Sequence, residues 1–244
     1  MSRLDEIYAL VDGLSDDGKR SVLDHIRKTV AIHPMEERLM ARAETVLEAI
    51  ARSSALTVRG IEGIIAEASF ATEVLPMTPQ LRSIPIDGDQ AFDFLLADGT
   101  PVSPIRIQVK MQRRRNHIPM RANEVERARR WPPDQYVVEL QRTRGGTRRA
   151  RHGAGDGDSA GASERTRPYR FGQFDILAVS LGASTGRWSN FIYAPELWLL
   201  ADPADPALLL KYQPVSASTD SDWTTDLLQV IQRVRKATPR KIRG

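Results

Sequence analysis

The sequence contains no cysteine, which excludes a disulfide framework, a thiolate zinc site and a cysteine nucleophile. Histidine is almost as scarce, with four residues scattered along 244 positions, so an imidazole-rich metal site is not expected. No stretch approaches roughly eighteen consecutive apolar residues, and the first residues lack the apolar segment of a signal peptide. We therefore expect a reduced, cytoplasmic protein, in which 41% hydrophobic residues suffice for a sizeable core.

The net charge of +4 conceals a strongly basic block in the middle of the chain. Residues 106–151 hold fourteen basic and four acidic side chains, whereas the remaining residues carry a net charge of −6. Thirteen of the fourteen bases are arginine, whose planar guanidinium group suits phosphates and guanine edges. A basic block in an otherwise acidic chain indicates a polyanion-binding face, and its density favours nucleic acid over an ordinary solvated surface.

Residues 1–54 have the hydrophobic spacing of helices. Apolar residues recur three and four positions apart before Gly13 and again after Ser15, which can cap a second helix. A third helix is expected to follow Pro34 and to continue through Ile50. These helices contain no chemically distinctive motif, so we expect a helical subdomain or a dimerisation arm.

Residues 55–244 predict a mixed α/β (α+β) core. The expected elements are a helix at 57–74, strands at 91–96 and 104–110 joined by a turn at Asp98-Gly99, a helix at 121–130, strands at 135–141, 174–181 and 188–193, and a closing helix at 222–236. Residues 143–167 contain six glycines, six arginines and no large apolar side chain, which predicts a mobile basic loop.

Two of the predicted strands carry an acid, an amide and a lysine. Because side chains alternate between the faces of a strand, Gln108 and Lys110 share one face. Asp93, flanked by Phe92 and Phe94, lies on the neighbouring strand and is expected beside them. Phosphodiester hydrolysis uses a carboxylate to hold a hard divalent cation and an ammonium group to stabilise developing negative charge. An ordinary surface strand explains the alternation, but neither the nearby arginines nor the acid between two phenylalanines.

This pattern resembles the PD-(D/E)xK nucleases, in which an acid on one strand is followed by acid-x-Lys on the next. Asp93 is followed fifteen residues later by Gln108-Val109-Lys110, and the glutamine looks like the variant of Mrr-type nucleases and some restriction enzymes. The likeness spans roughly residues 57–200, and the run 167–179 looks like the downstream strand region of type II restriction endonucleases. The resemblance implies a restriction-endonuclease-like core, with a central mixed β-sheet flanked by helices, as a nuclease domain at 55–244.

The resemblance also implies a further acid from the helix that precedes the hairpin. Glu67 lies on the flank of the apolar stripe of that helix and is our candidate, with Glu62 and Glu73 as competitors on the other flank. Asp87 and Asp89 are an alternative source of the first metal ligand, although their Asp-Gly setting is more typical of a turn.

The predicted catalytic group is Asp93, Gln108, Lys110 and Glu67. We expect Asp93, Glu67 and the amide oxygen of Gln108 to bind Mg²⁺. Because an amide contributes no charge, we expect one tightly held ion and a weaker second one, if any.

The expected DNA contacts are arginines within or just beyond the predicted strands of the basic block: Arg113, Arg114, Arg115, Arg121, Arg142 and Arg144. The resemblance implies a magnesium-dependent type II restriction endonuclease that cuts double-stranded DNA to leave 5′-phosphates. Such an enzyme is expected to be a homodimer and to accompany a cognate DNA methyltransferase. The alternatives are a repair, junction-resolving or modification-dependent nuclease, or a DNA-binding protein without catalysis.

Overall fold

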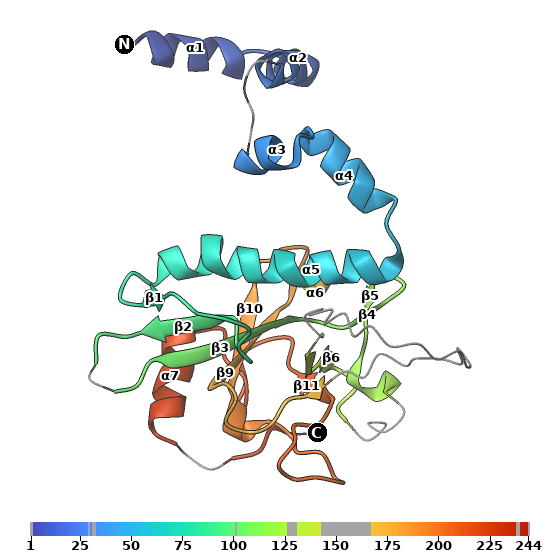
Figure 1. The fold of residues 1–244 in the computed structure, drawn as a ribbon, viewed down its shortest axis with the longest axis vertical. Helices are drawn as coiled ribbons and strands as arrows, with labels where there is room; N and C mark the ends of the chain where they lie inside the picture. The colour runs from blue at the N-terminus through green and yellow to red at the C-terminus, as the bar shows by residue number, and fades with distance from the viewer. Residues whose placement is uncertain are drawn as a thin grey trace, which may run out of the picture. The chain divides into compact units, whose positions relative to one another are not determined.

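The computed structural model describes residues 2–28, 30, 33–100, 102–125, 131–142, 167–237 and 240–243. The chain divides into two compact units, Met1–Gly60 and Ile61–Gly244 (Figure 1). The division falls within α5 (Ala55–Ser69). Within the described ranges, no helix combines the length and the apolar character that crossing a membrane requires.

The first unit consists of short helices. They are α1 (Arg3–Asp12), α2 (Asp16–Arg27), α3 (Pro34–Leu39) and α4 (Ala43–Ala51). Helices α1, α2 and α3 begin at residues whose side chains cap them, Ser2, Ser15 and His33. The hydroxyl of Ser15 accepts the backbone N–H of Gly18, which confirms the predicted cap of α2. The single helix predicted after Pro34 is wrong, because Met40 adopts a left-handed conformation with φ of 49° and separates α3 from α4. None of the residues in these four helices is buried.

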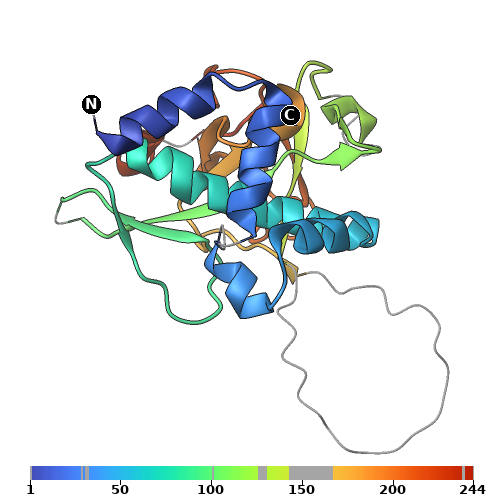
Figure 2. The same cartoon turned by 90° about the horizontal axis from the view of Figure 1, so that it is seen from above.

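The second unit begins within α5, which covers the central sheet. The chain continues from α5 into a π-helical turn, η1 (Phe70–Val74), and a 3-10 turn, η2 (Leu75–Met77). Ala66 and Phe70 lie four residues apart on the buried face of this helical stretch. Figure 2, seen from above, shows α5 overlying the strands.

The central sheet has five strands in the order β1-β2-β3-β9-β10. These are β1 (Arg82–Ile84), β2 (Phe94–Ala97), β3 (Ile105–Met111), β9 (Ile176–Ser180) and β10 (Phe191–Pro195). β3 and β9 run parallel, with Ile107 opposite Ile176, and every other neighbouring pair is antiparallel. The prediction of a mixed α/β fold around a central mixed sheet is therefore confirmed.

Each face of this sheet is covered by a different layer. Ile107 and Val109 of β3 pack with α5 and with α7 (Leu227–Arg235), as the alternation predicted. On the opposite face, Leu177 and Val179 of β9 pack against residues of β6 (Tyr136–Glu139) and β11 (Tyr212–Val215). The central sheet therefore lies between a helical layer on one face and a β layer on the other.

Two predicted elements differ from the structure because long-range pairing overrides local pattern. The part of the predicted helix 121–130 that the structure describes forms only a 3-10 turn, η3 (Ala122–Glu124), since the backbone N–H of Ala122 donates to the carbonyl of Gln135. The predicted strand 135–141 divides into β6 and β7 (Gln141–Arg142), and β6 pairs with β11 outside the central sheet.

The remaining differences concern the ends of elements. The predicted closing helix 222–236 begins only at Leu227, because the carboxylate of Asp226 caps it. A short helix, α6 (Gly182–Thr185), precedes β10. The predicted mobile loop at 143–167 falls outside the described residues except for Arg167, which begins β8 (Arg167–Pro168) opposite β7.

Candidate active site

Asp93 lies where β2 and β3 separate, one residue beyond their last paired positions. Its backbone N–H donates to the carbonyl of Ile107 (2.9 Å). Its Oδ2 accepts the backbone N–H of Val109 (2.7 Å) and the amide Nε2 of Gln108 (2.5 Å). The Asp93 carboxylate thus accepts the hydrogen bond that a backbone carbonyl of β2 would accept if its pairing with β3 continued. The two donors, the Val109 N–H and the Gln108 amide, fix its orientation.

Gln108 is buried, with 1% of its surface exposed, and its amide nitrogen faces Asp93. The same nitrogen donates to the carbonyl of Val109 (3.1 Å). In this arrangement Gln108 orients the Asp93 carboxylate and stabilises its charged form through a hydrogen bond. The predicted use of its amide oxygen as a metal ligand requires the amide to make a half-turn.

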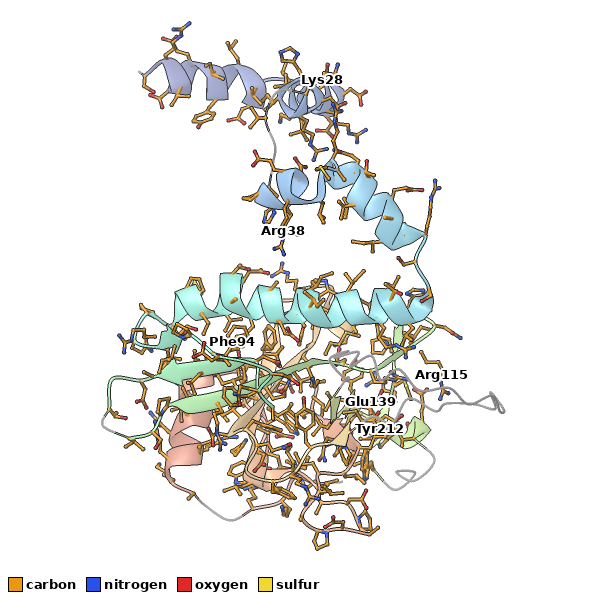
Figure 3. All side chains as sticks on the ribbon, viewed as in Figure 1. Lys28, Arg38, Phe94, Arg115, Glu139 and Tyr212 are labelled. Atoms are coloured by element: carbon orange, nitrogen blue, oxygen red, sulfur yellow. The ribbon has the colours of Figure 1, made fainter. Side chains whose placement is uncertain are left out.

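Glu67 of α5 shares the electrostatic environment of this carboxylate. Burial, and then the negative charge of Asp93, raise the pKa of Glu67 to about 7, against a lowering effect of Lys110. Burial likewise raises the pKa of Asp93, although Lys110 and the Val109 N–H act in the opposite direction. The structure therefore brings together two desolvated carboxylates and one ammonium group, from α5, the start of β2, and β3 (Figure 3 labels the adjacent Phe94).

The competing acids are engaged elsewhere. Glu62 forms an ion pair with Arg114, and Glu73 accepts a hydrogen bond from the Ser69 hydroxyl. Asp87 and Asp89 are exposed on either side of Gly88, whose φ of 71° is the left-handed conformation of a turn. Among the candidates on the helix, Glu67 is thus the one that interacts electrostatically with Asp93 and Lys110.

Lys110 has an aromatic neighbour that sequence reasoning missed. Its Nζ lies 5.6 Å from the centre of the Tyr169 ring, within the range of a cation–π interaction. Tyr169 is buried and directly follows β8. Tyr169 lies in the run 167–179, far from Lys110 in the sequence, so no local spacing rule predicts that the two side chains meet.

Two of the predicted DNA-binding arginines form ion pairs within the protein. Arg113 binds the carboxylate of Glu139 (2.8 Å), and Arg114 binds Glu62 of α5. Less than a quarter of the side-chain surface of Arg113 is exposed, and Arg114 is similarly covered. These contacts anchor the chain that follows β3, which limits the freedom of both side chains to reach a phosphate.

The other predicted arginines differ in what surrounds them. Arg115 is exposed, and Figure 3 labels it on the chain that follows β3. Arg121 is also exposed and lies over the ring of Tyr136, 4.3 Å from its centre. Arg142 is described only by its backbone, and Arg144 lies outside the described residues.

The side chains of the site suit one hard cation that is held partly by water and substrate, rather than a cation held by protein ligands alone. Within the described residues, no three side chains of Asp, Glu, His or Cys gather as a metal-binding group. Glu67 and Asp93 offer two carboxylates, and Mg²⁺ in proteins is often bound through one or two carboxylates together with water and substrate phosphates. Two half-buried carboxylates with raised pKa values are also a pair that a nearby cation stabilises.

A second polar cluster lies at the other end of β3. The guanidinium of Arg106 binds the carboxylate of Asp175 through two nitrogens (2.8 and 3.1 Å). Its Nη1 donates to the carbonyl of Gly172 (2.6 Å), whose own N–H donates to Glu196 (2.5 Å). Burial raises the pKa of Glu196 to about 7. This cluster borders a cavity of about 230 Å³ and joins the β8–β9 connection to the start of β3 and the end of β10.

No protein-family model, curated protein or solved structure matches this chain.

Proposed function

We propose that this chain is a magnesium-dependent endodeoxyribonuclease, a type II restriction endonuclease with a PD-(D/E)xK-like site and core. It hydrolyses both strands of double-stranded DNA and leaves 5′-phosphates. The observation that carries the proposal is the meeting of Glu67, Asp93 and Lys110 where β2 and β3 separate. The five-stranded mixed sheet, with Asp93 and Lys110 on two antiparallel neighbours, supports it.

Each residue of the site has a role that its contacts support. Asp93, held by Val109 and Gln108, and Glu67 are the residues to hold Mg²⁺. A bound Mg²⁺ supplies Lewis-acid polarisation of the scissile phosphate. Lys110 stabilises the negative charge that develops on the phosphate during attack by water. Burial of the site strengthens these interactions, because charges interact more strongly in a less polar medium.

The proposed homodimer places one site against each DNA strand. Within the described residues of Met1–Gly60, thirteen large apolar side chains are exposed, among them Leu4 (59%) and Leu56 (60%). The unit carries nearly equal numbers of acidic and basic residues, so it does not favour a polyanion. Apolar helices with little net charge suit a second copy of the same unit. The proposed enzyme works in the cytoplasm beside a cognate DNA methyltransferase.

The direct experiment is incubation of the purified protein with phage DNA and Mg²⁺. We expect discrete fragments, and none when the metal is chelated. Asp93→Asn and Lys110→Met should each reduce cleavage about a hundredfold or more, whereas DNA binding measured with Ca²⁺ should persist. The matched controls are Asp134→Asn and Lys236→Met, which change an exposed acid and an exposed lysine elsewhere.

The outcomes separate the alternatives. Discrete cleavage that Asp93→Asn leaves unchanged would contradict the assignment of the site. DNA binding without cleavage under any divalent cation would identify a non-catalytic DNA-binding protein. Cleavage confined to branched or methylated DNA would identify a junction-resolving or a modification-dependent nuclease.

A further inference from the structure

A small hairpin follows the strand that carries Lys110. It is formed by β4 (Arg114–Arg115) and β5 (Ile118–Pro119), which pair antiparallel. Asn116 and His117 form its two-residue loop. Four consecutive residues, Arg115 to Ile118, are exposed, and Ile118 retains 68% of its surface. An apolar side chain this exposed, next to three polar ones, indicates a contact surface.

The backbone of the loop is strained. Asn116 and His117 have φ of 51° and 64°, and a two-residue hairpin loop of this type normally carries glycine at one or both positions. Asparagine tolerates positive φ better than most residues, but two non-glycine residues in succession still cost free energy. Strain of this kind is concentrated at ligand-binding positions. The two side chains therefore contribute something that glycine would not.

The base of the hairpin is held firmly while its tip is exposed. The backbone N–H of Arg113 donates to the carbonyl of Val137 in β6 (2.7 Å), and the N–H of Met120 donates to the carbonyl of Arg113 (2.8 Å). The ion pair of Arg114 with Glu62 ties β4 to α5. A hairpin anchored to both β6 and α5 presents its tip in a defined position, and recognition of DNA bases requires such a fixed position.

We propose that this hairpin tip reads base edges in the major groove of duplex DNA and sets the sequence specificity of the enzyme. The inference rests on the proposed function and extends it. The major groove admits a two-stranded ribbon. Arginine suits guanine, asparagine suits adenine, and an apolar side chain suits the thymine methyl group. Arg115, Asn116 and Ile118 provide these three chemistries on one turn.

The distance along the chain limits where the bases that the hairpin reads can lie. Asn116 lies six positions after Lys110, and six extended steps of the chain span at most about 20 Å. Since base pairs are stacked about 3.4 Å apart, the bases lie within about six base pairs of the scissile phosphate.

The test compares DNA sequences selected by the wild type and by hairpin variants. A random duplex pool is bound in Ca²⁺ and sequenced, and the ends of fragments cut in Mg²⁺ are sequenced separately. The key variant is Asn116→Gly with His117→Gly, which removes both side chains but suits the turn. Arg115→Ala is the second variant, and Arg82→Ala, an exposed arginine of β1, is the control.

We expect both hairpin variants to lose on the order of tenfold to a hundredfold of base discrimination at one to three positions near the cut. Thermal stability should be retained in both variants, so that the change in base preference does not come from unfolding. Unchanged preferences in both variants, no enrichment by the wild type, or loss only beyond about six base pairs would overturn the proposal. Sequence-specific binding without cleavage would contradict the nuclease function. In that case the sequences bound in Ca²⁺ by the wild type and the variants would alone decide whether the hairpin sets specificity.

Discussion

Replacement of Asp93 by alanine should destabilise the second unit, apart from any effect on catalysis. The change removes the acceptor of two hydrogen bonds, those from the Val109 N–H and the Gln108 amide. An unsatisfied buried donor costs about 1–3 kcal/mol, whereas removal of a half-buried carboxylate with a raised pKa returns part of that. We expect the free energy of unfolding to fall by about 2–4 kcal/mol. Asp93→Asn retains an acceptor oxygen and should cost about 1 kcal/mol or less.

Urea unfolding followed by tryptophan fluorescence measures this difference directly. All four tryptophans, Trp131, Trp188, Trp198 and Trp223, lie in the second unit with Asp93, so the signal reports that unit. The asparagine variant should unfold close to the wild type and still fail to cleave DNA, which separates the structural role of the carboxylate from its catalytic one. If the alanine variant is as stable as the wild type, or the asparagine variant as unstable as the alanine one, the account of these two hydrogen bonds is wrong.

Three further predictions test other parts of the molecule. The pKa of Glu196 is about 7 in the folded state, against 4.5 for an ordinary glutamate. The contribution of Glu196 to stability is therefore full below about pH 4.5 and is lost by about pH 7, and it amounts to at most about 3 kcal/mol. In thermal unfolding, Glu196→Gln should reduce the fall in stability between these pH values and be the more stable protein at pH 8. Tyr169→Leu should lower the kcat of cleavage several-fold and shift its pH profile, because a cation–π contact is worth about 0.5–2 kcal/mol. Tyr169→Phe keeps the ring and should retain the kcat and the pH profile of the wild type. An equal loss of kcat in the two variants would argue against the ring contact. Ile7→Glu combined with Leu23→Glu should yield monomers in light scattering, with the exposed Lys19→Glu as control, and persistence of the dimer would place its interface elsewhere.

The positions of Asp93, Gln108 and Lys110 could be predicted because they depend on local rules. Strand alternation gave the shared face of Gln108 and Lys110, and the turn at Asp98-Gly99 gave their antiparallel neighbour. Amphipathic spacing likewise placed Glu67 on a helix that packs against the sheet. The direction of the Gln108 amide was not predictable, because it depends on the hydrogen bonds available at the end of β2.

Features that depend on distant pairing were not visible in the sequence. β6 joins β11, more than seventy residues later, and no local pattern indicates which strand it will choose. Tyr169 and Glu196 reach their partners through similarly remote contacts. The loop of Asn116 and His117 lacks the glycine that marks most two-residue hairpins, so it gave no turn signal.

The pairing of β7 with β8 brings together the two ends of the basic segment that connects them. Arg142 and Arg167 are direct partners in this ladder, so the chain departs from and returns to neighbouring positions. An Asn-Gly turn could therefore close the gap in place of the intervening residues without displacing Tyr169 or the sheet.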